Sequence, residues 1–104
     1  MDNRRLEPRY RVRVAGDLHD GMSGPVDVAV ANLSVGGCRF SARRAIEAGV
    51  YVTLALGSAG YYDGRVVWSD GGEHGVAFEH PLHPAVLDHI RHFVSEQPAF
   101  RAEA

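Results

Sequence analysis

The sequence predicts an all-β fold, a six-stranded antiparallel barrel of the Greek-key type that is followed by one C-terminal α-helix. Three observations support this prediction. Apolar and polar residues alternate with a period of two in short runs, as in strands with one buried face. Clusters of Gly, Ser, Pro and Asp separate these runs and are typical of turns. Near the end of the chain, apolar residues recur instead at helical spacing.

Each of the predicted strands has an apolar face. In the first strand, Tyr10, Val12 and Val14 alternate with Arg11 and Arg13, so one face is apolar and the other is basic. The remaining apolar faces consist of Val26, Val28 and Val30, then Cys38 and Phe40, then Val50, Val52, Leu54 and Leu56, then Val66 and Trp68, and finally Val76 and Phe78. Turns are expected at 19–25, 57–60 and 70–72, and a connection or one short helical turn at 42–49.

The last predicted element is an amphipathic helix over residues 84–96. Pro84 suits its first position, because proline lacks the N–H group that is unpaired there. We expect the helix to cover an open end or side of the barrel. The chain then forms a single domain with a flexible arm (1–9), the barrel (10–80), the helix and a tail (97–104). The apolar positions at helical spacing are Val86, Leu87, Ile90, Phe93 and Val94.

Composition favours a small globular protein of the cytoplasm. The chain has 104 residues, of which 45% are hydrophobic and 23% are charged, as in ordinary soluble domains. No apolar run approaches the roughly 18 residues of a membrane span, and the N-terminus lacks the apolar region of a signal peptide. The single cysteine, Cys38, cannot form an internal disulfide and lies in an apolar stretch, so we expect a buried, inert thiol.

Positive charge is concentrated at the N-terminus. Residues 1–13 contain five arginines and two acidic residues, whereas the rest of the chain contains six arginines and eleven acidic residues. All eleven basic residues are arginine, whose planar fork binds phosphates and guanine edges at two points. Because a GC-rich genome would also favour arginine, this bias permits the recognition of an anion without establishing it.

Two short motifs contain the candidate binding residues. The first contains Arg4, Arg5 and Arg9, and Pro8 keeps this segment from continuing as a helix. The second contains Asn32 and Ser34, which lie two residues apart and therefore share one face of a strand. Simpler explanations are a solvated basic tail for the first motif and an Asx or Ser turn for the second. The sequence Asn32-Leu33-Ser34 also matches a glycosylation sequon, which would require secretion.

Two glycines follow the second motif. Gly36 and Gly37 fit a hairpin turn, because glycine accepts the positive φ that tight turns require.

Together the two motifs resemble those of the PilZ family, bacterial receptors of cyclic di-GMP, whose signature combines R-x-x-x-R with [D/N]-x-S-x-x-G. The order and the separation of the two motifs fit that family, and so do the later segments GRVVW and HGVAF. The similarity extends over roughly residues 4–95. Asn32 is an allowed variant of the acidic residue, so it must act through hydrogen bonds alone.

The resemblance implies a non-enzymatic receptor that binds cyclic di-GMP and signals to an effector protein. Arg5 and Arg9 would bind guanine edges or phosphates, with help from Arg4. Asn32 and Ser34 would bind a guanine edge, and Gly37 would allow close approach of the backbone. Trp68 occupies a position where the family often has an aromatic residue, although packing in the core or at its rim is an alternative role. No other cofactor, no DNA and no membrane insertion is expected, and we expect a monomer.

Other function classes are less well supported by the sequence. The pairs His80/His83 and His89/His92 have a spacing that metal ligands can use, but no cysteine lies near them. Ser34 is not in a nucleophile elbow, and no P-loop is present. Two alternatives remain open: an adaptor that binds proteins without a nucleotide, and a small RNA-binding barrel that uses Tyr10, Arg11 and Arg13.

Overall fold

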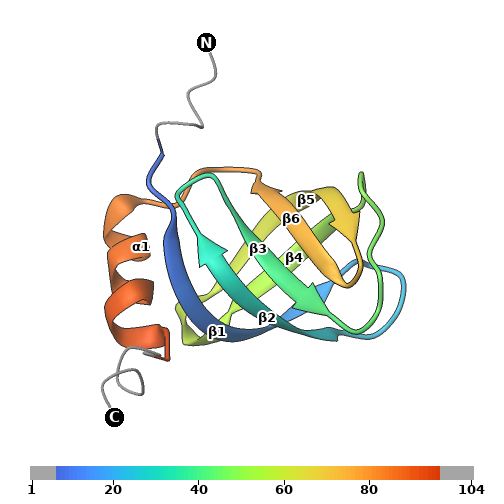
Figure 1. Cartoon of the computed structure of the whole chain (residues 1–104), viewed down its shortest axis with the longest axis horizontal. Coiled ribbons are helices and arrows are strands. Elements are labelled where there is room, and N and C mark those ends of the chain that lie inside the picture. The colour runs from blue at the N-terminus through green and yellow to red at the C-terminus, as the bar shows by residue number, and fades with distance from the viewer. Residues whose placement is uncertain (1–6, 97–104) are drawn as a thin grey trace.

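The structure of the chain is a computed structural model that describes residues 7–96, and it contains a β-barrel and a short helical segment (Figure 1). The predicted tail over 97–104 and residues 1–6 of the predicted arm lie outside the described residues. The strands are β1 (Tyr10–His19), β2 (Val26–Leu33), β3 (Gly37–Ala42), β4 (Tyr51–Leu56), β5 (Tyr61–Asp70) and β6 (Glu73–Phe78).

The six strands pair antiparallel and close into a barrel in the order β1-β2-β3-β6-β5-β4. Two pairs, β3 with β6 and β1 with β4, join strands that are not consecutive in the chain. Because β4 returns to the side of β1, the first four strands have the order 4-1-2-3 of a Greek key. The predicted six-stranded antiparallel barrel is therefore confirmed.

The alternation in the sequence sets the inner and outer faces of the strands. In β1, Val12 and Val14 are buried whereas Arg11 and Arg13 are exposed, as predicted. The removal of these aliphatic side chains from water is the main contribution that favours folding of the barrel. The core also contains Leu18, Val28, Val30, Leu33, Phe40, Val52, Leu54, Leu56, Val66, Val76 and Phe78.

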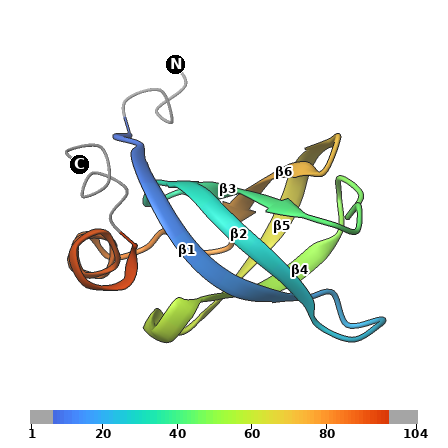
Figure 2. The same cartoon turned by 60° about the horizontal axis from the view of Figure 1, so that its bottom comes forward.

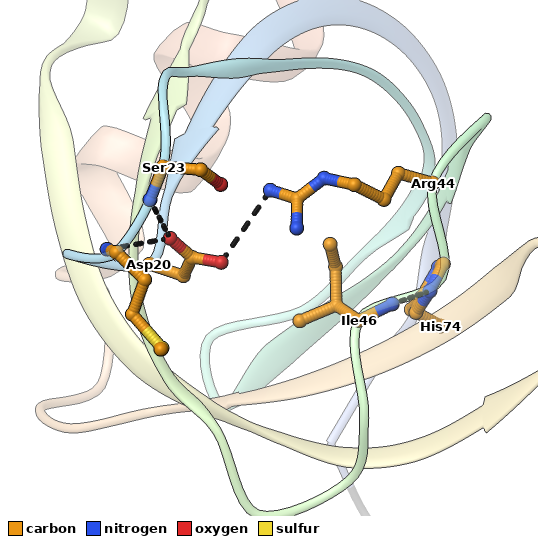
Figure 3. Close-up of polar contacts among 6 residues, drawn as sticks. Asp20, Ser23, Arg44, Ile46 and His74 are labelled. Atoms are coloured by element: carbon orange, nitrogen blue, oxygen red, sulfur yellow. Dashed lines mark hydrogen bonds and ion pairs between the residues drawn. The ribbon is translucent and has the colours of Figure 1, made fainter.

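The loop between β1 and β2 is fixed by Asp20. Its Oδ1 accepts hydrogen bonds from the backbone N–H groups of Met22 (2.9 Å) and Ser23 (3.3 Å), and its Oδ2 lies 3.4 Å from Nη2 of Arg44 (Figure 3). These bonds, above all those from Met22 and Ser23, lower the pKa of the Asp20 carboxyl below its usual value. The ionised carboxylate therefore holds the loop at the end of the barrel.

A buried histidine fixes the connection between β3 and β4, which contains no helical turn. The backbone N–H of Ile46 donates to Nε2 of His74 over 3.0 Å (Figure 3), and both side chains are buried. The His74 ring stacks on Phe40, with ring centroids 4.7 Å apart and an interplanar angle of 8°. His74 therefore ties an irregular connection to the strand β6.

The C-terminal helical segment has two parts, α1 (Pro84–His89) and the π-helix η3 (Ile90–Val94). It stands beside β1, outside the ring of strands, in Figures 1 and 2. Pro84 is at its N-terminus as predicted, and Nδ1 of His83 caps it by accepting the N–H of Ala85. Leu87 and Ile90 are buried against the barrel.

One predicted core position of this helix is wrong, because Phe93 is 79% exposed. In the π turn, the N–H of Ser95 bonds to the carbonyl of Ile90, five residues earlier, over 2.8 Å. This wider turn moves Phe93 away from the face of Ile90, while Val94, which is also predicted on that face, packs against the core.

Candidate ligand-binding site

The predicted binding residues that the structure describes meet in one pocket of about 240 Å³. Its lining includes residues just before β1 and residues of the β2–β3 turn. These two segments lie at the same end of the barrel (Figure 1). A larger hollow of about 860 Å³ lies at the other end of β2 and β3, between Asp27 and Arg43, and none of the predicted residues lines it. We therefore assign the smaller pocket as the candidate site. Its lining includes Glu7, Arg9, Asn32, Ser34, Gly36, Gly37, Cys38, Arg39, Trp68 and Gly75.

A row of paired residues crosses five strands, and its part from Asn32 to Trp68 lines this pocket, whereas Arg11 at its other end lines a neighbouring hollow. Asn32 in β2 is paired with Arg11 on one side and Arg39 on the other. Arg39 is paired with Gly75 in β6, and Gly75 with Trp68 in β5. Gly75, which has no side chain, therefore lies between Arg39 on one neighbouring strand and Trp68 on the other.

Trp68 reaches this row because the β5 strand is irregular. Val66 pairs with Val76 and Trp68 with Gly75, so Val67 is an extra residue, a β-bulge. The expectation that Val66 and Trp68 share a face is wrong, since Val66 is fully buried and Trp68 is 41% exposed. The bulge removes Trp68 from the core and brings it to the pocket.

The absence of a side chain on Gly75 determines where the Trp68 indole lies. A Cβ atom on Gly75 would overlap Nε1 of Trp68. The indole therefore covers the backbone of β6, at the edge of the pocket. An aromatic surface in this place is suited to contact with a planar base.

Ser34 has its hydroxyl group engaged with the backbone of the β2–β3 turn. Its Oγ accepts the N–H of Gly36 over 3.2 Å and donates to the carbonyl of Gly37 over 3.4 Å. The N–H of Ser34 also donates to that carbonyl, over 2.9 Å. Ser34, which is only 7% exposed, thus forms the Ser turn that was the simpler explanation of the motif.

The two glycines of this turn are needed for space and not for a left-handed backbone. Neither Gly36 nor Gly37 has a positive φ, so the expectation based on turn conformation is wrong. A Cβ on Gly37 would overlap the carbonyl of Val76 in β6, and one on Gly36 would lie 2.6 Å from Oε1 of Glu7. Gly37 thus lets β3 approach β6, and Gly36 leaves room for a carboxylate in the pocket.

The charged residues of the pocket are only partly those that the motifs predict. Arg9 lines the pocket, whereas Arg4 and Arg5 lie outside the described residues. Two further residues were not predicted: Glu7, and Arg39, whose Nε lies 3.2 Å from Oε1 of Glu73. Single charges on a strand or before a proline look the same as ordinary surface charges. Strand pairing brings Arg39 to the pocket, and the space over Gly36 admits Glu7, and neither relationship is visible in the local sequence.

Cys38 lies on the inner side of the pocket lining and is buried, as expected. Its burial raises the pKa of the thiol to about 12. The group is therefore a protonated, weakly reactive thiol at neutral pH.

The histidine pairs do not form a metal site in the part of the chain that the structure describes. Within residues 7–96 no group of three or more potential ligands is arranged to hold a metal ion. His83 instead caps α1, and His89 lies against Phe93 with ring centroids 5.4 Å apart.

Residues 3–96 match the sequence model of the family described as the PilZ domain. The chain belongs to the PilZ family. Its family is one of binding and adaptor domains, and cyclic di-GMP is the ligand associated with it. No curated protein matches the chain significantly. In this PilZ domain, none of the helices between residues 7 and 96 is long and apolar enough to cross a membrane.

Proposed function

We propose that this PilZ domain binds cyclic di-GMP in the pocket between the N-terminal segment and the β2–β3 turn. The observation that carries the proposal is that Arg9, which precedes the barrel, lines the same pocket as Asn32 and Trp68. These residues are far apart in the sequence and supply the three kinds of contact that a guanine nucleotide needs.

Each of these contacts has a physical basis. The guanidinium of Arg9 can bond to a phosphate or to O6 and N7 of guanine at two points. The Asn32 amide both donates and accepts hydrogen bonds at a base edge. A base that stacks on the Trp68 indole gains about 1–3 kcal/mol.

A neighbouring hollow provides space for the rest of a cyclic dinucleotide. It has a volume of about 530 Å³ and shares Asn32 and Arg39 with the pocket. Arg11 and Arg13 line it together with the small residues Ala29, Ala31 and Ser41, and its acidic residue, Glu73, is paired with Arg39. A ligand with one base in the pocket would extend its negative phosphates toward these arginines.

Signalling would follow from the position of the binding residues. A ligand held by both Arg9 and the barrel fixes the N-terminal segment against the barrel, and the changed surface can then bind or release an effector protein. The chain would act as a receptor and adaptor of the cytoplasm, without catalysis.

Calorimetry with cyclic di-GMP tests the proposal. We expect wild type to bind and Arg9→Ala to lose at least tenfold in affinity. Arg43→Ala, which removes the same charge at an exposed site outside the pocket, should bind like wild type. No binding by wild type at high micromolar ligand would refute the function and favour an adaptor that uses no nucleotide.

A competition experiment separates the remaining alternative, an RNA-binding barrel. GTP and a short RNA should compete poorly with cyclic di-GMP if the proposal is correct. One observation already speaks against RNA stacking on Tyr10, because the guanidinium carbon of Arg91 lies 3.8 Å from the centre of that ring.

A further inference from the structure

We infer that Glu7 selects guanine over other bases in this pocket, by accepting hydrogen bonds from the donor edge of the base. The inference rests on the proposed function and adds a residue that lies between the motif arginines. Guanine presents two adjacent donors, N1–H and the N2 amino group, which a carboxylate can accept with its two oxygens.

The position of Glu7 meets this requirement. Glu7 lines the pocket together with Arg9, Asn32 and Trp68 and is half-buried. Its carboxylate lies over Gly36, so close that a Cβ atom there would be 2.6 Å from Oε1. The glycine therefore makes room for the carboxylate inside the binding site.

The other acceptors of the pocket are too few for the donor edge of guanine. The hydroxyl of Ser34 already accepts from Gly36 and donates to Gly37. Asn32 has one carbonyl oxygen and no negative charge, since the acidic variant of its motif is absent. Among the pocket-lining residues within 7–96, Glu7 is the only one with a carboxylate.

A carboxylate also discriminates against adenine. Adenine has a lone pair at N1 in the place of the N1–H of guanine, so an acceptor there meets another acceptor. A site built to pair a polar group strongly rejects a ligand that leaves the group unpaired. Arg9 lines the same pocket, and its charge offsets part of the repulsion between Glu7 and the ligand phosphates, whereas Arg39 is already paired with Glu73.

The test compares cyclic di-GMP with cyclic di-AMP by calorimetry, for wild type and for Glu7→Gln. The amide keeps the shape of the side chain but loses one acceptor and the charge. We expect Glu7→Gln to bind cyclic di-GMP at least tenfold more weakly and cyclic di-AMP no more weakly than wild type does. The preference for guanine should thus fall at least tenfold. Glu47→Gln, the same change at an exposed residue outside the pocket, should leave both affinities unchanged.

Each outcome has a definite meaning. Unchanged affinities in Glu7→Gln, or tighter binding of both ligands, would overturn the inference, because the carboxylate would then be idle or merely repel the phosphates. Failure of wild type to bind cyclic di-GMP would instead refute the proposed function. Glu7 precedes β1, and the far-ultraviolet circular dichroism and melting temperature of the variant should confirm that the barrel is intact.

Discussion

The indole of Trp68 lies against the backbone of Gly75 on the neighbouring strand, in a space that a Cβ atom on Gly75 would occupy. This contact joins the aromatic edge of the pocket to the strand pairing of β5 and β6. The position of the indole therefore depends on a residue that makes no polar contact of its own.

We predict that Gly75→Ala displaces Trp68 and weakens binding of cyclic di-GMP. The added methyl group forces the indole or the backbone to move, which typically costs about 1–3 kcal/mol of stability. Trp68 is the only tryptophan, so its fluorescence reports the displacement directly. Urea denaturation measures the loss of stability, and calorimetry measures the loss of affinity for cyclic di-GMP.

Gly24→Ala is the matched control. A Cβ atom there would meet no atom within 4 Å, and the residue does not have a positive φ. Fluorescence and affinity of this variant should equal those of wild type. If Gly75→Ala also left them unchanged, the contact between Trp68 and Gly75 would not position the indole.

The place of Trp68 also shows the limit of the sequence pattern. Six strands could be predicted because alternation depends only on which side chains are apolar. The bulge at Val67 reverses the face of the residues after it, and no glycine or proline in the run VVWS marks it. Pairing with β6 determines the bulge, and a pairing between strands is not visible in one strand alone.

The candidate site was predictable to a similar extent. Arg9 and Asn32 are predicted from the two motifs and Trp68 from the resemblance to the PilZ family, and the structure brings all three into one pocket. Glu7 and Arg39 are not predicted as site residues, because their place in the pocket depends on residues that are distant in the sequence. Glu7 lies over Gly36, and Arg39 stands between Asn32 and Gly75 in adjacent strands.

We predict that the two polar residues of the strand motif respond differently to truncation. Ser34→Ala removes the buried acceptor of the Gly36 N–H and should cost about 1 kcal/mol of stability. Asn32→Ala, at a half-buried position, should change stability by less than about 0.5 kcal/mol and weaken cyclic di-GMP binding by about 1–3 kcal/mol. Urea denaturation and calorimetry on the two variants measure both quantities. Equal losses of stability would contradict the division of roles.

We predict that His74→Phe loosens the connection between β3 and β4 while the core stays packed. Phenylalanine preserves the stack on Phe40 but leaves the buried N–H of Ile46 without its acceptor, a cost of about 1–3 kcal/mol. The change also removes the buried Nδ1, which has no hydrogen-bond partner among the described residues, so the net loss should lie near the lower value. Amide hydrogen exchange at Ile46 should become faster. Unchanged exchange would show that the hydrogen bond does not hold the connection.

We predict a large difference between two apolar positions of the helical segment. Ile90→Ala empties a fully buried site and should cost about 2–5 kcal/mol, whereas Phe93→Ala, at a 79% exposed site, should cost less than about 0.5 kcal/mol. The sequence pattern makes the two positions equivalent, and the π turn separates them. Similar losses in urea denaturation would place Phe93 in the core and contradict the π turn.

The buried thiol of Cys38 should make the protein less stable at high pH. Burial raises the pKa of Cys38 from its ordinary value of 9.0 to about 12. Between these values the unfolded chain releases the proton and the folded chain retains it, so the free energy of unfolding falls as pH rises, by at most about 1.4 kcal/mol per pH unit. Urea denaturation of wild type and Cys38→Ala at about pH 7 and about pH 10 isolates the contribution of Cys38. The other groups that titrate at alkaline pH are present in both proteins, so their contributions cancel. The stability of wild type relative to the variant should decrease at the higher pH. A constant difference, or rapid alkylation of the native thiol at neutral pH, would show that the folded protein exposes Cys38.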